Sequence, residues 1–265
     1  MTSTGGEGRP ARVLPADTVG SGPRLVVAHG FTQNAGAWGP ILAALARHHE
    51  VVAVDLPGHG RAASVRADLA ESADLLGGTG GHADYLGYSL GGRVALHLAL
   101  ARPELVRRLV LVGATAGIED GDARLARRQA DDALADVLER GASEHPDQAL
   151  DRFLERWLAG PLFATLDPGD AALGARRANT AAGLASSLRL CGTGTQGPLW
   201  DKLGALAMPV LVLAGVLDVR FAALGGRMVH AIGPNATLAL VPGAGHACHL
   251  ERPAATARIV EAFLA

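Results

Sequence analysis

The chain has 265 residues, of which 49% are hydrophobic, and a formal net charge of −2. This length allows one large domain or a core with a subdomain, and the near-neutral charge argues against a general nucleic-acid surface, which needs a strongly basic balance. Lys202 is the only lysine, so almost all the positive charge belongs to arginine, which grips planar carboxylates with two parallel hydrogen bonds.

The N-terminal segment is rich in Gly, Thr and Pro and has no apolar stretch of the kind found in signal peptides. We therefore predict a flexible N-terminus over residues 1–21, with neither a signal peptide nor a membrane anchor. No apolar run approaches the ~20 residues that span a bilayer. Cys191 and Cys248 are too few for a disulfide framework, which fits a reducing cytoplasm.

Short apolar runs then alternate with helix-like segments along most of the chain. Nearly continuous apolar strands of this kind indicate a mostly parallel sheet with helices on both faces. The predicted strands are residues 25–28, 51–54, 85–88, 109–112, 209–214 and 237–241, and the predicted helices are residues 41–46, 91–101, 221–232 and 253–264.

The strand signal disappears between residues 118 and 203, where helix-forming residues carry many arginines. An insertion at this point would lie over the carboxyl ends of the strands, where open α/β sheets bind ligands. We predict that residues 118–203 form a helical lid, and that residues 22–117 and 204–265 together form the core.

The pentapeptide Gly87-Tyr88-Ser89-Leu90-Gly91 lies between a predicted strand and a predicted helix. This is the context of a nucleophile elbow, in which glycines permit a strained turn that exposes the serine hydroxyl. Asp218 and His246 each follow a later apolar run. The chain order Ser, Asp, His is that of the α/β-hydrolase fold, which is the predicted fold class.

These three residues predict a catalytic triad, in which His246 takes the Ser89 proton and Asp218 fixes the histidine tautomer. The activated oxygen of Ser89 could attack a carbonyl or remove a proton from carbon. The backbone N–H groups of Leu90 and Phe31 are the predicted oxyanion hole, which would serve a tetrahedral oxyanion or an enolate equally well. Fold and triad therefore leave the reaction class open.

Other candidate sites fail on spacing. His249 is a weaker rival to His246 as the base, and this pair lacks a third ligand, so no metal site is predicted. Residues 192–197 resemble a phosphate loop, but they lack the Lys-Ser/Thr ending and a preceding strand. His29 is interpreted as a structural or oxyanion-loop residue, because one base already serves the serine.

Several motifs from residue 24 to the C-terminus resemble the 2-succinyl-6-hydroxy-2,4-cyclohexadiene-1-carboxylate synthase family of menaquinone biosynthesis. The elbow and the Pro-Gly-His segments are shared with many hydrolases, so the motifs of the predicted lid carry the specificity. The matching segments are residues 29–32, 54–60, 87–93, 127–131, 161–163, 183–189, 192–194 and 243–251, together with Trp157.

The resemblance implies a lyase that removes pyruvate from a cyclohexene bearing succinyl, carboxylate and enolpyruvyl groups, without a metal or organic cofactor. Several carboxylates on one substrate need several charge-assisted donors, unlike an apolar ester. Carried over by position, the triad is the one named above, and the substrate-binding residues are Tyr88, Arg93, Arg127, Trp157 and Arg176.

Some features depart from the family pattern or remain open. Val216 and Arg220 stand where many relatives have Glu and Lys, and the register leaves a choice between Arg176 and Arg177. A general serine esterase or C–C hydrolase would use the same triad, and a non-catalytic receptor could share the fold. The expected partner is a small polycarboxylate. The sequence has no exposed apolar stripe or heptad pattern that would predict an interface between subunits. A monomer is therefore compatible with the sequence, and the oligomeric state stays open.

Overall fold

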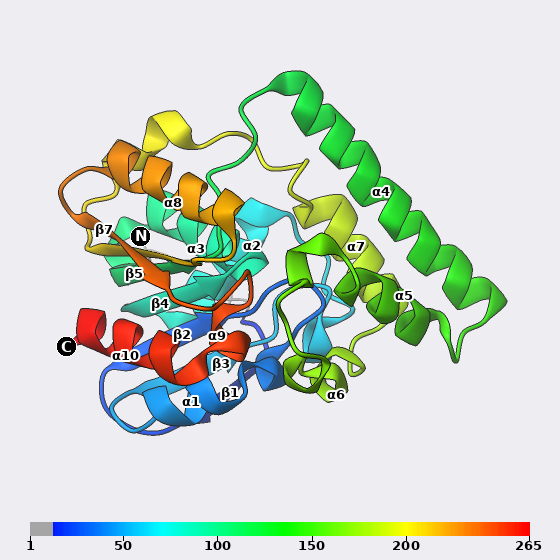
Figure 1. The fold of residues 1–265 in the computed structure, drawn as a ribbon, viewed down its shortest axis with the longest axis horizontal. Coiled ribbons are helices and arrows are strands. Elements are labelled where there is room, and N and C mark those ends of the chain that lie inside the picture. Colours follow the sequence, from blue (N-terminus) through cyan, green and yellow to red (C-terminus); the bar gives the residue numbers. More distant parts are fainter. Residues whose placement is uncertain (1–12) are drawn as a thin grey trace, which may run out of the picture.

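The computed structural model describes residues 13–265. Within this range a seven-stranded sheet has the strand order β1-β3-β2-β4-β5-β6-β7 (Figure 1). Neighbouring strands run parallel, except that β1 is antiparallel to β3. The strands are β1 (Ala16–Val19), β2 (Arg24–Ala28), β3 (Glu50–Val54), β4 (Ala83–Tyr88), β5 (Val106–Val112), β6 (Val210–Gly215) and β7 (Ala236–Val241).

The central strands are apolar along their length because they bury both faces. In β2, Val26 and Ala28 enter one hydrophobic core, whereas Leu25 and Val27 enter the other, since successive strand residues point to opposite faces. Each fully buried Val or Leu contributes roughly 1.5–3 kcal/mol by leaving water. The first core is closed by α2 (Leu69–Gly80), α3 (Leu90–Ala101) and α8 (Val219–Ile232), and the second by α1 (Pro40–Leu45) and α10 (Pro253–Leu264).

The predicted fold class is confirmed, and the predicted core strands and helices appear within a few residues of their expected bounds. The predicted flexible segment is wrong at Ala16–Val19, which pairs with β3. This edge strand is short and mostly exposed, so its sequence carries little apolar signal. The first twelve residues of the predicted flexible segment lie outside the described residues.

Helix α2 was missed because its C-terminal half is rich in glycine. Its start does carry a signal in the sequence. Asp68 caps the helix by accepting from the N–H of Glu71, and the Glu71 side chain accepts from the N–H of Asp68. This reciprocal pair is a capping box, which marks helix starts.

Residues 118–203, which we call the insertion, contain α4 (Gly121–Glu144), α5 (Ala149–Leu158), α6 (Leu173–Arg176) and α7 (Ala181–Cys191). Figure 1 shows α4 and α5 lying to one side of the sheet, beyond α7. A small core of its own, which includes Leu138, Phe153 and Leu184, joins α4, α5 and α7. Within the described range, no helix is long and apolar enough to cross a membrane.

Candidate active site

The turn from β4 to α3 holds Ser89 in a strained conformation. Its φ is +50° and its ψ is −105°, a region that non-glycine residues rarely occupy and that costs roughly 1–3 kcal/mol. A Cβ on Gly87 would lie 2.3 Å from the Gly91 carbonyl oxygen, and one on Gly91 would lie 2.0 Å from the Ala28 carbonyl oxygen. Only glycine fits at these two positions, so the sequence pattern and the backbone agree that this is an elbow.

The structure brings Ser89, Asp218 and His246 together at the carboxyl ends of β4, β6 and β7. The distance from His246 Nδ1 to Asp218 Oδ2 is 2.8 Å, and the distance from His246 Nε2 to Ser89 Oγ is 3.3 Å. Because a carboxylate only accepts, the proton of the neutral imidazole is on Nδ1. The free lone pair of Nε2 then faces the serine hydroxyl, which is the arrangement a general base needs.

Asp218 and His246 are themselves fixed by their surroundings. The second oxygen of Asp218 caps α8, since Oδ1 accepts from the Phe221 N–H at 3.2 Å. The buried Glu251 of α9 (Cys248–Glu251) accepts from the N–H of Gly245 at 2.7 Å and from that of Ala247 at 3.0 Å. Glu251 therefore holds both neighbours of His246, a role that our reading of the sequence missed.

The two predicted oxyanion donors lie on neighbouring loops. Leu90 is the first residue of α3, so its N–H has no acceptor within the helix. Phe31 follows β2, and its loop is tied to the elbow because the Gly91 N–H donates to the His29 carbonyl oxygen at 3.0 Å. This hydrogen bond holds the loop after β2 against the first turn of α3, which is the arrangement of an oxyanion hole in this fold.

His29 has a structural environment. Its Nδ1 lies 2.8 Å from the Gly30 carbonyl oxygen, and its Nε2 accepts from the Leu56 N–H at 3.0 Å. Burial lowers its pKa to about 4. A neutral imidazole with both nitrogens occupied cannot accept a further proton from Ser89, in agreement with the structural interpretation.

Residues 29–34, which follow β2 and include Phe31, are called the oxyanion loop below. Thr32, which follows Phe31 in this loop, has a φ of +67° and is fully buried. A β-branched residue in the left-handed region is a clear outlier, with a cost of roughly 1–3 kcal/mol. Two residues of the insertion contact it. The Arg176 Nη1 donates to its hydroxyl, and the Asn179 Nδ2 donates to its carbonyl oxygen at 2.7 Å.

Arg176 is a fully buried cation with unused hydrogen-bonding capacity. Its Nε donates to the Ala171 carbonyl oxygen at 2.7 Å, and its Nη2 has no hydrogen-bond partner among residues 13–265. Burial lowers its pKa to about 10, so it keeps its charge at neutral pH. Burial of a cation is costly unless an anion or another acceptor meets it, so this guanidinium is suited to receive a carboxylate.

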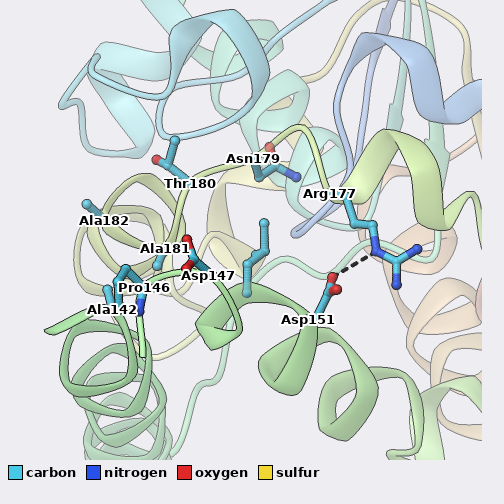
Figure 2. Close-up of a pocket in the computed structure, with 10 residues that line it drawn as sticks. Ala142, Pro146, Asp147, Asp151, Arg177, Asn179, Thr180, Ala181 and Ala182 are labelled. Atoms are coloured by element: carbon cyan, nitrogen blue, oxygen red, sulfur yellow. Dashed lines mark hydrogen bonds and ion pairs between the residues drawn. The ribbon is translucent and has the colours of Figure 1, made fainter. Parts of the chain in front are cut away.

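Arg177 has the opposite environment. It is exposed, and its Nε donates to Asp151 Oδ1 at 2.8 Å. Figure 2 shows this pair among the residues that line a hollow within the insertion. The hollow has a volume of about 540 Å³ and is lined by residues of α4, α5 and α7 and of the segments before α5 and α7. The hollow is lined by none of the triad residues, and the Arg177 guanidinium already has an anionic partner.

The other two predicted arginines already have protein partners. Arg93 is buried on α3 and donates to the carbonyl oxygens of Cys191 and Gly192, at 2.7 and 3.3 Å. Burial lowers its pKa to about 10. Arg127 on α4 is partly exposed and pairs with the buried Asp131 at 2.8 Å. Arg93 therefore joins α3 of the core to the end of α7, whereas the pair of Arg127 and Asp131 lies within α4 of the insertion.

The predicted aromatic residues form a wall beside the triad. The ring of Tyr88 lies 5.3 Å from that of His246, and burial raises the Tyr88 pKa. Trp157 lies 5.1 Å from Phe31 and 5.9 Å from Phe163, and Phe163 in turn lies 6.3 Å from His246. The insertion thus contributes an apolar surface next to the histidine.

His249 does not compete with His246 for the serine. Its Nε2 lies 3.2 Å from Gln33 Nε2, and its ring packs 5.1 Å from that of Trp38. Burial lowers its pKa to about 3. In the part of the chain that the structure describes, no group of three His, Cys, Asp or Glu residues is placed to hold a metal ion.

Comparison with known proteins gives consistent relatives. Residues 25–259 match the Alpha/beta hydrolase family. The chain is 32% identical to the 2-succinyl-6-hydroxy-2,4-cyclohexadiene-1-carboxylate synthase of Klebsiella pneumoniae, over 92% of this chain and 94% of that protein. It is also 32% identical to the pimeloyl-[acyl-carrier protein] methyl ester esterase of Nitrosomonas europaea, over 89% of this chain and 94% of that protein.

Among solved structures, MenH from S. aureus superposes with a TM-score of 0.84 and 27% sequence identity. The match covers 94% of this chain and 97% of that one. Coverage of 94% must include most of the insertion, so the similarity extends beyond the sheet.

Proposed function

The chain belongs to the alpha/beta hydrolase family, and we propose that within this family it is a lyase with a Ser-His-Asp triad. Its substrate would be 2-succinyl-5-enolpyruvyl-6-hydroxy-3-cyclohexene-1-carboxylate, from which it eliminates pyruvate. The other product is 2-succinyl-6-hydroxy-2,4-cyclohexadiene-1-carboxylate, an intermediate of menaquinone biosynthesis. The Klebsiella relative carries the name of this activity.

The observation that carries this proposal is the environment of Arg176. Its buried guanidinium has an unoccupied Nη2 among the described residues, and it packs 5.8 Å over Phe163, the ring beside His246. An apolar ester would leave this charge unpaired, whereas a substrate carboxylate would supply the missing acceptor. A polycarboxylate therefore suits the surroundings of Arg176 better than an uncharged ester.

The proposed reaction begins when His246 Nε2 takes the Ser89 proton and the serine oxygen removes a ring proton next to a carbonyl. Asp218 stabilises the imidazolium that forms. The N–H groups of Leu90 and Phe31 hold the enolate oxygen. The electron pair of the broken C–H bond then forms a new ring double bond, the pair of the existing ring double bond moves to the carbon that bears the enolpyruvyl group, and the C–O bond at that carbon breaks. The released enolate takes the proton from His246 and becomes pyruvate, while Ser89 keeps the ring proton as its hydroxyl hydrogen.

In this proposal one of the remaining predicted residues binds a substrate carboxylate directly and the others support it. Arg176 holds one carboxylate through Nη2, while Arg93 and Arg127 strengthen the positive field at the elbow side of the insertion. Tyr88 and Trp157 contribute apolar contacts. The insertion acts as a lid that keeps water from the enolate. These steps use only protein side chains and backbone N–H groups. As part of the same proposal, the enzyme acts as a monomer in the cytoplasm.

The test is a pyruvate-release assay with the enolpyruvyl substrate, run beside an aryl-ester hydrolysis assay on the same preparation. We expect one pyruvate per ring product, unchanged by a chelator, and slow ester turnover because an uncharged ester cannot pair the buried arginine. Fast ester turnover without pyruvate would refute the lyase assignment.

Fast ester turnover without pyruvate release would indicate the alternative function, a serine esterase or C–C hydrolase. The esterase relative at 32% identity and the apolar wall of Phe31, Trp157 and Phe163 favour it, because the same triad and oxyanion hole would serve acyl transfer. Binding of the substrate without either product would instead indicate a receptor.

A further inference from the structure

The two oxyanion donors are held in place by different parts of the chain. Leu90 is held by α3, whose first turn belongs to the core. Phe31 precedes Thr32, whose backbone lies at a φ of +67° and would return to negative φ if left free. The conformation of Thr32 therefore constrains the course of the loop that carries the Phe31 N–H.

Asn179 uses every hydrogen-bonding atom of its amide to hold this region. Its Nδ2 donates to the carbonyl oxygens of Thr32, at 2.7 Å, and of Arg176, at 2.9 Å. Its Oδ1 accepts from the Gly60 N–H at 2.8 Å. One side chain, only 5% exposed, thus ties together the oxyanion loop, the loop after β3 and the insertion.

A second contact supports the same connection. Asn34 Nδ2 donates to the Ala175 carbonyl oxygen, so the turn after Thr32 is bound to the segment just before Arg176. The oxyanion loop and the α6 segment are consequently one hydrogen-bonded unit, although 147 positions separate Thr32 from Asn179.

We propose that Asn179 is a positioning residue for the oxyanion hole, which it sets by fixing Thr32 and thereby the Phe31 N–H. This inference rests on the oxyanion hole of the proposed function, but it holds for either reaction of Ser89. The insertion then does more than cover the substrate, because it completes the site that stabilises the transition state.

The test compares Asn179→Ala with Asn235→Ala. Asn235 is a matched control, because its Nδ2 also donates to two backbone carbonyls, those of Leu206 and Met208, at 2.7 Å each, and it lies outside the site. We expect Asn179→Ala to lower kcat by roughly 10- to 100-fold, the scale of a misplaced catalytic group, with KM changed by less than about threefold. Asn235→Ala should leave kcat unchanged.

A fluorophosphonate probe separates this inference from the lyase assignment. In that reaction the Ser89 oxygen bonds to phosphorus, fluoride leaves, and His246 takes the hydroxyl proton, while the phosphoryl oxygen occupies the oxyanion hole. The probe has no carboxylate, so a change at Arg176 alone would not slow it. Slower labelling of Asn179→Ala supports the inference even if the wild type releases no pyruvate.

Thr32→Gly provides a further check, since glycine adopts positive φ without strain. The loss caused by Asn179→Ala should be smaller in the Thr32→Gly background than in the wild type. Equal labelling rates for Asn179→Ala and Asn235→Ala, or a loss confined to KM, would overturn the proposal.

Discussion

Arg176 and Arg177 are adjacent in the chain and have opposite environments. Arg176 is fully buried with an unoccupied Nη2 among the described residues, whereas Arg177 is exposed and paired with Asp151 at 2.8 Å. The sequence alone did not decide which of the two contacts the substrate. Their different environments lead us to expect opposite effects when each is replaced.

We expect Arg176→Ala to lower kcat/KM for the enolpyruvyl substrate by roughly 10- to 150-fold, because a hydrogen bond to a charged group is worth about 1.5–3 kcal/mol. Arg177→Ala should change it by less than about twofold, because an exposed ion pair contributes little. Steady-state kinetics of both variants is the measurement. Equal, small effects would mean that the charge of Arg176 does not meet the substrate.

Asp218→Asn tests the tautomer argument. The amide oxygen of the new side chain can still accept from the Phe221 N–H and cap α8, so the fold should survive. The amide cannot hold the His246 proton on Nδ1 in the same way, so kcat should fall by about 10⁴-fold.

Ser89→Ala serves as the reference, with a loss at least as large. Circular dichroism and pyruvate release would be measured together. A folded Asp218→Asn variant that keeps more than about a tenth of kcat would contradict the triad.

Glu251→Gln should weaken the loop that carries His246. One amide oxygen can still accept from Gly245 or Ala247, but the NH₂ group faces the other N–H, which costs about 1–3 kcal/mol of stability. We expect kcat to fall by roughly 10-fold with KM nearly unchanged, since a small displacement of the base reduces catalysis. Glu104→Gln, at an exposed pair with Arg102, is the control and should change neither quantity.

Three buried histidines make the fold sensitive to acid. Burial lowers the pKa of His29 to about 4 and those of His59 and His249 to about 3. Between the ordinary value of about 6.5 and these values, the unfolded chain binds protons that the folded chain does not. Their stabilising contribution is therefore present above pH 6.5 and is lost as the pH falls toward 4 for His29 and toward 3 for His59 and His249.

Each histidine should contribute a slope of up to about 1.4 kcal/mol per pH unit to the free energy of unfolding. Urea unfolding at pH 7, 6 and 5 measures it. His59→Asn keeps a donor for the Pro57 carbonyl oxygen and removes one titrating group, so its slope should be shallower. Parallel pH curves for this variant and the wild type would contradict the assignment.

The core could be predicted because its strands are continuous apolar runs, which need no knowledge of distant contacts. The elbow was equally local, since Gly87 and Gly91 each lie two residues from the serine in the chain. The contacts of Thr32 could not be predicted, because they depend on how the insertion folds back. The register at Arg176 likewise depends on Ala172, whose φ of +51° starts a short helix in a conformation that the sequence does not signal.

Strands β5 and β6 are parallel, hydrogen-bonded neighbours, with Leu109 opposite Val210 and Val112 opposite Leu213, so the insertion lies within the connection between two adjacent strands and interrupts no strand of the sheet. An exchange of this segment between family members should therefore leave the triad strands intact and offers a direct route to chimeric enzymes with new substrates. On our proposal, a chimera whose inserted segment lacks an equivalent of Asn179 would have the new substrate-binding residues but a poorly positioned oxyanion loop. Successful chimeras should thus carry residues 32 and 179 as a pair.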